Sequence, residues 1–408
     1  MIAPGNPIRF SVRFIVPANF PGAIVRITAD TANVLVDWGI PTTVMFPAVD
    51  WWDYKLFEIS RLRGLRRVLR ILRLAVEAAF RLCVPRPWCG FKYHSVDPRV
   101  RSARYGLVPS AARWNEREVT VVHPPYLIPH LLRTIPNSRV KMVSALHMNL
   151  EKAIRSSSER AAVWYQHWVA RERLLSVPRY TTSEEARAAA ERLGIEVRTV
   201  IPDGVDLHLF HPPKDRLAGR PPVVTLYCVR HAQKGQADGL EALRQIKAEI
   251  PEVRLHALGE LLPGHAGLFE REYGYLHGED YADAVRQSDI FIYPSRYDGF
   301  PAPPLQALAS GCALVTTAVA GVSDYAVSGE NALVVPPGDV AGLKDAVRKL
   351  LGDPALRRRL QAAGMETAQK YDVRTTSRQL LEFLREVHEE GNHEPELSGS
   401  RASADLRF

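Results

Sequence analysis

The sequence is poor in cysteine, with four in 408 residues, at positions 83, 89, 228 and 312. They form no CxxC pair and show no histidine at zinc-ligand spacing, so a disulfide scaffold is excluded and no redox motif is indicated. The sequence also lacks any run of about 18 apolar residues, and it lacks the basic and apolar regions of a signal peptide. These absences predict a protein of the reducing cytoplasm with no membrane-spanning segment.

Several ligand-binding signatures are also missing from the chain. No P-loop and no GxGxxG occur, which argues against ATP hydrolysis and dinucleotide binding. No Asp-x-Asp pair is present, and the two histidines of HEEGNH (388–393) are five residues apart in a polar tail rather than in an HExxH motif. The sequence therefore predicts no metal and no tightly bound cofactor.

Positive charge is unevenly distributed along the chain. The net charge is +8, with 53 basic and 45 acidic side chains. Residues 1–202 hold 30 basic and 16 acidic side chains, a net of +14, so residues 203–408 hold the remaining 23 and 29, a net of −6. A total charge says little until it is located, and here the basic excess is N-terminal, which weakens an interpretation as a nucleic-acid-binding protein.

Apolar strand-like runs alternate with amphipathic segments in the N-terminal half, a pattern typical of βα units in a parallel sheet. A strand, a turn and a helix are predicted at 9–17, 18–23 and 24–38. Later strands are predicted at 41–47, 118–123, 139–147, up to Tyr180, and 196–202.

The C-terminal half repeats this alternation, which predicts a second Rossmann-like α/β domain. Its strands are predicted at 222–229, 252–259, near Tyr275, 289–295, 313–317 and 332–337, and its helices at 237–249, 279–288, 303–310, 340–351 and 354–370. The expected domains are 1–203 and 204–372, followed by a helix at 373–390 that crosses back to the first domain and a polar, disordered tail at 391–408.

One segment, 61–83, interrupts the alternation with a basic amphipathic helix. Arginines such as Arg66, Arg70 and Arg73 share one face, and apolar side chains such as Leu65 and Leu69 share the other. The simpler interpretation is a helix packed on its own domain with a solvated arginine face. The functional alternative is an interfacial helix on anionic lipid, where each cation near the surface contributes about 1 kcal/mol.

The most informative stretch is SDIFIYPSRYDGFPAPPLQALASGCALVTT (288–317), which reads as a strand, a loop and a helix beginning at a proline. It resembles the retaining glycosyltransferases of the GT-B fold, family-four type, also called glycosyl transferases group 1. The similarity extends upstream over YTTSEEARAAAERLGIEVRTVIPDGVDLHLFHP (180–212) and downstream over AGVSDYAVSGENALVVPPGDVAGLKDAVRKLLGDPALRRRL (320–360). Several motifs in the same order carry the resemblance.

The resemblance implies an α/β GT-B fold, in which two Rossmann-like domains with parallel sheets face a central cleft. It also implies a metal-independent enzyme that moves a hexosyl group from a nucleotide-diphosphate sugar to a glycan or lipid-linked acceptor with retention of configuration. The donor would bind mainly to the C-terminal domain. Synthesis of cell-envelope polysaccharide, in the cytoplasm or on the inner face of the plasma membrane, is the expected setting, with no nucleic-acid partner.

Residues for the leaving group and donor sugar come from the C-terminal domain. Arg230 and Lys234, in LYCVRHAQKG (226–235), resemble the family's cations that contact the diphosphate. Two cations after a strand suit a dianionic leaving group. By resemblance Asp298 would hold sugar hydroxyls and Gln306 the ribose, and the same loop and helix place Gly299 and Phe300 in the donor site.

Within the stretch 288–317, three positions depart from the family pattern. Asp298 and Gln306 stand where the family has two glutamates, and Pro301 replaces a glycine. Glutamine lacks the second acceptor oxygen that a carboxylate offers to a ribose diol. A deoxyribose nucleotide such as dTDP, which has no 2′-hydroxyl, is one hypothesis that accommodates Gln306.

Residues near the reaction centre are predicted from the N-terminal domain. His147 ends a strand where the family has a histidine that contacts the donor sugar, and together with Arg230, Lys234 and Asp298 it completes the predicted catalytic set. His123 ends the preceding strand and is a candidate acceptor contact. Gly22 is a candidate for close approach of backbone to phosphate. Trp51 and Trp52 follow the second strand and either stack on an acceptor sugar or pack against the helix at 61–83.

Two alternatives remain open from the sequence. A GT-B-fold sugar-nucleotide epimerase would release nucleotide with no acceptor present, and it would need paired acid and base groups that the sequence does not identify. A catalytically inactive sugar-nucleotide-binding protein is the other alternative, motivated by Asp298, Gln306 and Pro301.

Overall fold

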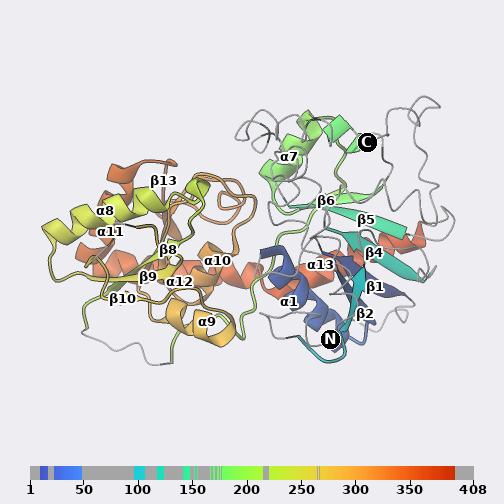
Figure 1. The fold of residues 1–408 in the computed structure, drawn as a ribbon, viewed down its shortest axis with the longest axis horizontal. Helices are drawn as coiled ribbons and strands as arrows, with labels where there is room; N and C mark the ends of the chain where they lie inside the picture. The colour runs from blue at the N-terminus through green and yellow to red at the C-terminus, as the bar shows by residue number, and fades with distance from the viewer. Residues whose placement is uncertain are drawn as a thin grey trace, which may run out of the picture. The chain divides into compact units, whose positions relative to one another are not determined.

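The computed structural model describes residues 10–16, 23–47, 96–105, 117–123, 141–147, single positions between 151 and 173, 175, 177–214, 220–263, 265 and 267–390. These residues divide into two compact units. The first holds the described residues up to Thr181, Ala189–Val200 and those from Ser377 onward, and the second holds Thr182–Ala188 and Ile201–Thr376. Figure 1 shows a parallel sheet in each unit.

The described part of the first unit contains a seven-stranded parallel sheet in the order β3-β2-β1-β4-β5-β6-β7. Its strands are β1 (Ser11–Ile15), β2 (Thr42–Pro47), β3 (Arg101–Tyr105), β4 (Glu118–Val122), β5 (Lys141–Leu146), β6 (Arg179–Thr181) and β7 (Thr199–Val200). Nearly continuous burial along β4 and β5 fits central strands that are covered on both faces. The parallel arrangement brings the ends of β4 and β5, and therefore His123 and His147, to the same edge.

Helices cover this sheet in the order that the sequence predicts. Helix α1 (Ala23–Asp37) follows β1, and α7 (Glu184–Arg192) follows β6. Helix α13 (Val373–Glu389) begins in the second unit, and its residues from Ser377 belong to the first. There Phe383 packs edge-on against Tyr180, and the imidazole of His388 stacks on Phe10.

Strand β3 is absent from the sequence-based prediction. It lies at the edge of the sheet, next to β2, and Arg101 and Ser102 are exposed. A polar edge strand shows none of the apolar alternation from which strands are predicted, and its arginines suit an edge that avoids pairing with other chains.

The second unit has a six-stranded parallel sheet among its described residues, in the order β10-β9-β8-β11-β12-β13. Its strands are β8 (Val223–Cys228), β9 (Arg254–Gly259), β10 (Arg271–Glu272), β11 (Ile290–Tyr293), β12 (Ala313–Thr317) and β13 (Ala332–Val335). The strand predicted near Tyr275 lies a few residues earlier, at β10. Tyr275 itself is 57% exposed and follows Gly274, which has φ of +65°.

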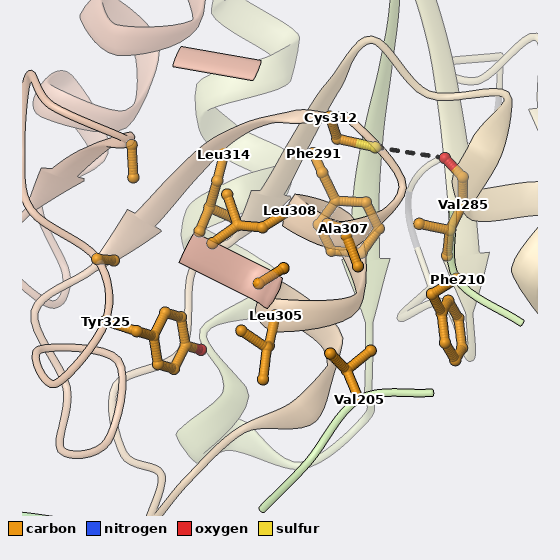
Figure 2. Packing of buried hydrophobic residues seen from close by; sticks show 14 of the residues in the cluster. Val205, Phe210, Val285, Phe291, Leu305, Ala307, Leu308, Cys312, Leu314 and Tyr325 are labelled. Atoms are coloured by element: carbon orange, nitrogen blue, oxygen red, sulfur yellow. Dashed lines mark hydrogen bonds between the residues drawn. The ribbon is translucent and has the colours of Figure 1, made fainter. Parts of the chain in front are cut away.

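Side chains of alternate sheet positions supply two separate cores. Ile290 and Ile292 point into a core with α8 (Gln236–Glu249) and α11 (Val340–Gly352). Phe291 points into the other core, with α9 (Gly278–Arg286), α10 (Ala302–Ala309) and α12 (Pro354–Lys370) (Figure 2). This alternation with a period of two is what places helices on both faces of the parallel sheet.

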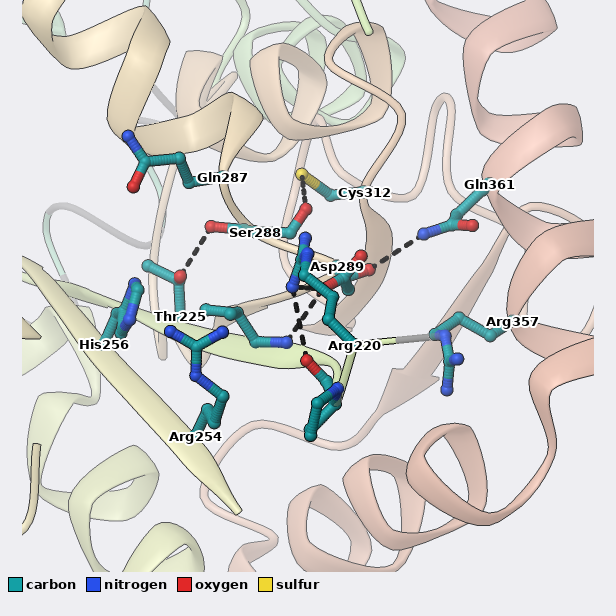
Figure 3. Close-up of polar contacts among 12 residues, drawn as sticks. Arg220, Thr225, Arg254, His256, Gln287, Ser288, Asp289, Cys312, Arg357 and Gln361 are labelled. Carbon is teal, nitrogen blue, oxygen red and sulfur yellow. Dashed lines mark hydrogen bonds and ion pairs between the residues drawn. The ribbon is translucent and has the colours of Figure 1, made fainter. Parts of the chain in front are cut away.

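Polar contacts fasten the amino ends of β8 and β11 (Figure 3). One Asp289 carboxylate oxygen accepts hydrogen bonds from Arg220 at 2.7 Å and from the Val223 amide at 2.8 Å. Gln361 of α12 donates to the Asp289 carbonyl at 3.1 Å. Each buried polar group has a partner here, so this end of the sheet is fixed while the opposite end carries the loops of the candidate site.

Candidate active site

The loop after β8 is shaped by a short 3₁₀ helix and one glycine. Ala232–Lys234 forms the 3₁₀ turn, capped by His231, and Gly235 follows with φ of +62° before α8 begins. A Cβ at Gly235 would lie 1.9 Å from the carbonyl oxygen of Pro294. Only glycine fits this close approach, which brings the loop carrying Lys234 against the end of β11.

The Lys234 ammonium lies beside the Asp298 carboxylate, with Nζ 2.5 Å from Oδ2. The Tyr293 hydroxyl, at the end of β11, donates to the same oxygen. The Gly299 amide donates to Oδ1 at 3.0 Å. The Lys234 and Asp298 side chains remain 29% and 17% exposed, so this three-residue cluster of Lys234, Asp298 and Tyr293 keeps a solvent-accessible face at the carboxyl edge of the sheet.

The Tyr293 hydroxyl is a persistent donor to this carboxylate. Burial, and secondarily the negative charge of Asp298, raise the pKa of Tyr293 well above its usual value. The phenol therefore stays protonated across the physiological pH range and orients the Asp298 carboxylate through its hydrogen bond.

The segment carrying Asp298 is tied to the Lys234 loop by further contacts. Arg296 binds the Asp238 carboxylate in bidentate fashion at 2.7 and 2.6 Å. The Gln233 carbonyl accepts the amides of Arg296 at 2.8 Å and Tyr297 at 3.2 Å. Bidentate pairs of this kind fix orientation as well as position, so the two predicted donor-binding loops form one connected structure.

Arg230 lies apart from this cluster in the structure. Its side chain is 60% exposed, and Nε lies 3.1 Å from a Glu260 carboxylate oxygen. The Glu260 loop is held by Gln236, which donates to the Glu260 carbonyl at 2.7 Å and accepts the Leu262 amide at 2.6 Å. The role of Arg230 in binding diphosphate stays a prediction.

Gly299, Phe300 and Gln306 lie where the Asp298 loop passes into α10. Phe300 is buried against the rings of Tyr325 and Tyr371, at 5.5 and 6.0 Å between centroids, so its side chain supports the loop from within. Gln306 is 3% exposed on α10. The geometry shows how these residues shape the loop, and their contacts with a donor stay predictions.

Gly321, on a neighbouring loop, also shapes this part of the site. It has φ of +63°, and a Cβ there would lie 2.2 Å from the Gly299 carbonyl oxygen. Pro301 caps α10 without a side-chain hydrogen bond, and its carbonyl accepts the Tyr325 hydroxyl at 3.1 Å. At this position proline lacks an amide donor, but its carbonyl oxygen still accepts a hydrogen bond from Tyr325.

In the first unit His147 and His123 lie together at the ends of β5 and β4. His123 Nδ1 and His147 Nε2 are 2.8 Å apart, and His123 Nε2 is 3.2 Å from Thr28 Oγ1 on α1. His123 is 5% exposed. Burial at this level counts against the predicted contact between His123 and an acceptor, whereas His147 is only partly buried.

Both imidazoles are neutral near pH 7. Burial lowers the pKa of His147 to about 4. Burial, with a secondary contribution from His147, lowers the pKa of His123 well below its usual value. Neither ring carries the fixed positive charge that would attract a phosphate, so at neutral pH this pair acts through hydrogen bonds.

The depressed pKa of His147 predicts a pH-dependent stability. Because the unfolded state binds its proton at about pH 6.5 and the folded state at about 4, the free energy of unfolding falls as the pH falls through this window. Between pH 7 and 5 the loss is about 2 kcal/mol. Urea denaturation of wild type and His147→Gln at both pH values measures it.

Glu118 shifts stability in the opposite direction, which is why the variant is needed. Burial raises its pKa to about 6 despite the neighbouring Arg13, so this group favours the folded state as the pH falls from 6 toward 4.5. The difference in pH-dependent unfolding free energy between wild type and His147→Gln isolates the contribution of His147. An unchanged pH dependence in the variant would contradict the assignment.

Tyr293 allows a further prediction on the Asp298 carboxylate. Tyr293→Phe removes a buried donor, and we expect it to cost about 1–1.5 kcal/mol of unfolding free energy. A double-mutant cycle with Asp298→Ala, followed by urea denaturation, measures the coupling. Additive effects of the two substitutions would show that the hydroxyl does not hold the carboxylate.

Sequence reasoning missed Tyr293, Glu260 and Thr28. Tyr293 reads as one more core residue of a buried strand, since nothing in IFIY distinguishes a ring that ends in a bonded hydroxyl. Thr28 lies within an amphipathic helix, and Glu260 follows a strand. A polar residue just after a strand is the signal that could have identified Glu260.

Several predicted features fall outside the described residues. They are Gly22, Trp51, Trp52, the basic helix at 61–83 and the tail at 391–408. Within the described ranges no group of three or more His, Cys, Asp or Glu side chains is arranged to hold a metal ion. No helix within them is long and apolar enough to cross a membrane.

A cavity of about 510 Å³ lies at the amino end of β8 and β9, away from the loops described above. Arginines line it, but Arg220 is paired with Asp289, Arg254 with Glu270, and Arg286 with Glu279 and Asp283. Lys214 also lines the cavity.

Comparison with known proteins assigns the C-terminal part of the chain. Residues 222–353, which contain Lys234, Asp298 and Gln306, match the family model described as Glycosyl transferases group 1. Residues 222–353, named here the group 1 domain, are thus similar to glycosyl transferases group 1. The prediction made from the motifs at 288–317 and 320–360 is thus confirmed.

Curated relatives of the chain are also named as glycosyltransferases or polysaccharide synthases. Glycogen synthase of Mycobacterium tuberculosis (strain CDC 1551 / Oshkosh) is 30% identical over 196 residues, covering 45% of this chain and 47% of that protein. The lipopolysaccharide core biosynthesis mannosyltransferase LpcC of Rhizobium leguminosarum bv. viciae is 29% identical over 233 residues, covering 51% and 63%. The chain spans about half to two thirds of the length of these relatives.

The fold outside the group 1 domain is shown by structural likeness. Anabaena Alr3699/HepE, solved in complex with UDP and glucose, superposes with a TM-score of 0.65 at 14% identity, covering 92% of this chain and 99% of that one. With the two parallel sheets, this confirms the predicted α/β GT-B fold of two Rossmann-like units.

Proposed function

We propose that the protein is a retaining, metal-independent glycosyltransferase that moves a hexosyl group from a nucleotide-diphosphate sugar to a glycan or lipid-linked acceptor. The observation that carries the proposal is the cluster of Lys234, Asp298 and Tyr293 at the carboxyl edge of the second sheet. It lies within the group 1 domain, and relatives of that domain include a glycogen synthase and a mannosyltransferase.

The cluster has the chemistry that a nucleotide sugar requires. Lys234 supplies a cation for the diphosphate, whose charge grows as the glycosyl bond breaks. Asp298 lies 2.5 Å away and supplies carboxylate oxygens for sugar hydroxyls. A ligand with phosphate adjoining a polyol would therefore meet both groups at once, in a loop already fastened by Arg296 and Gly235.

Thermal shift with UDP-, GDP- and dTDP-sugars in the presence of EDTA tests this proposal. A ligand at 100 times its dissociation constant adds about 2.7 kcal/mol of stability. We expect at least one donor to stabilise the protein without metal. No stabilisation by any nucleotide sugar would contradict the proposal, and binding only after Mg²⁺ or Mn²⁺ is restored would contradict its metal independence.

The nucleotide is proposed from Gln306. Its buried amide replaces a family glutamate that would grip a ribose diol, and dTDP lacks the 2′-hydroxyl. The same screen ranks the donors. Clearly tighter binding of UDP- or GDP-sugars than of dTDP-sugars would overturn the assignment of dTDP.

A sugar-nucleotide epimerase and an inactive binding protein are separated from a transferase by one assay. Nucleotide release that depends on an added acceptor supports transfer. Release with no acceptor present favours the epimerase, and tight donor binding without release under either condition favours the inactive protein.

We propose further that the protein acts at the inner face of the plasma membrane, in synthesis of cell-envelope polysaccharide. The support is the arginine-rich stretch at 61–83 and the lipopolysaccharide relative. We expect co-sedimentation with liposomes that contain anionic lipid, and several-fold less pelleting of Arg66→Glu/Arg70→Glu, since each cation contributes about 1 kcal/mol. Equal pelleting of both proteins would refute the membrane contact.

A further inference from the structure

A chain of hydrogen bonds links helix α1 to the predicted donor-sugar contact in the first unit. Thr28 Oγ1 lies 3.2 Å from His123 Nε2, and His123 Nδ1 lies 2.8 Å from His147 Nε2. The three residues come from α1 and from the ends of β4 and β5. Three separate elements of the fold are therefore joined at the side chain of His147.

The rings of this chain are also held by packing. The Phe14 ring lies nearly parallel to His123, at 5.9 Å between centroids, and the His147 ring lies at the edge of His123, at 4.9 Å. Tyr180 packs edge-on against His147 at 6.2 Å. Both nitrogens of His123 have hydrogen-bond partners and the residue is 5% exposed, so its ring cannot turn without losing both hydrogen bonds.

The hydrogen bonds impose a proton count on the pair. A neutral imidazole has one nitrogen that donates and one that accepts, and burial keeps both rings neutral near pH 7. The contact between His123 Nδ1 and His147 Nε2 thus contains one proton. The nitrogen of His123 that carries the ring proton of His123 therefore decides which nitrogen of His147 carries the ring proton of His147.

We propose that His123 is a positioning residue that fixes the tautomer and ring orientation of His147, with Thr28 fixing His123 in turn. When Thr28 donates, His123 donates to His147 and the His147 proton lies on Nδ1. When Thr28 accepts, every donor and acceptor reverses and the His147 proton lies on Nε2. The tautomer of His147 therefore follows, through two hydrogen bonds, from whether the Thr28 hydroxyl donates or accepts.

Nitrogen-15 NMR of the full-length protein labelled at histidine tests the proposal without any substrate. The nitrogen shifts of a neutral imidazole identify its tautomer. We expect a single tautomer of His147 in wild type. His123→Asn keeps a polar atom near the position of Nδ1, which preserves a hydrogen bond to His147 but not the link to Thr28. Thr28→Val and His123→Leu should give a mixture of tautomers.

Thr28→Val is the decisive variant, since valine matches the shape of threonine and lacks only the hydroxyl. Circular dichroism and thermal unfolding check that each variant folds. A single His147 tautomer, unchanged from wild type in folded Thr28→Val and folded His123→Leu, would overturn the proposal. If His123→Leu does not fold, Thr28→Val alone decides.

Steady-state kinetics connect the positioning role of His123 to the proposed function. The kinetic experiment rests on that proposed function, whereas the NMR experiment does not. With UDP-glucose, GDP-mannose and dTDP-glucose as probes, we expect Thr28→Val to lower kcat about tenfold with little change in KM, the effect of one hydrogen bond. His123→Asn should recover most of the loss seen in His123→Leu. Mixed tautomers with unchanged kcat would contradict the proposed role of His147 and leave the positioning role supported.

Discussion

Lys234→Ala is expected to lower kcat/KM for glycosyl transfer about 10²- to 10³-fold, the effect of removing one group that stabilises developing charge. The lysine lies at the carboxyl edge of the second sheet beside Asp298, where its ammonium would meet the leaving diphosphate. Steady-state kinetics with the donor found by thermal shift measure the loss. We also expect Lys234→Ala to bind nucleoside diphosphate more weakly than wild type does.

The matched control for Lys234→Ala is Lys344→Ala. Lys344 also forms an ion pair, with Glu249 at 3.1 Å, but it lies on α11 and is not part of the candidate site. We expect the control to keep wild-type kinetics and to lose less than about 1 kcal/mol of stability. A similar loss of activity in both variants, or none in Lys234→Ala, would show that Lys234 does not bind the leaving group.

Gly235→Ala is expected to destabilise the second unit by about 3 kcal/mol or more. An L side chain in the left-handed region costs about 1–2 kcal/mol, and the added Cβ would lie 1.9 Å from the Pro294 carbonyl oxygen. The carbonyl oxygen belongs to the backbone and the Cβ is attached directly to it, so neither atom can move as the end of a flexible side chain would. Overpacking of this kind adds about 1–3 kcal/mol. Urea denaturation measures the loss.

Gly274→Ala separates the clash from the conformational strain. Gly274 has φ of +65°, close to the +62° of Gly235, but a Cβ there would meet nothing within 4 Å. We expect the control to cost about 1–2 kcal/mol. Equal destabilisation by the two substitutions would mean that the approach of the Lys234 loop to β11 is not tight.

Most of the fold could be predicted because buried parallel strands are locally apolar. The strands predicted at 313–317 and the helix predicted at 354–370 match β12 and α12. The prediction failed at two edge strands of the described sheets, Arg101–Tyr105 and Arg271–Glu272, which are paired on one side only and lack apolar alternation.

The candidate site was predictable in its residues and not in its contacts. Lys234 and Asp298 follow strands that end at the same edge of a parallel sheet, so their proximity follows from topology. The hydroxyl of Tyr293 contacts a side chain in the loop that follows its own strand, and His123 contacts Thr28 from a separate element. Periodicity carries no information about them, because it reports which face is buried and not which polar atoms meet there.

Calorimetric titration of UDP-, GDP- and dTDP-sugars in EDTA, into wild type, Lys234→Ala and Lys344→Ala, tests the central claim most directly. We expect at least one donor to bind wild type and Lys344→Ala with the same affinity. The same donor should bind Lys234→Ala at least about tenfold more weakly, a loss of about 1.4 kcal/mol of binding free energy. Binding of every donor to Lys234→Ala with wild-type affinity, or binding of none to wild type, would contradict that claim.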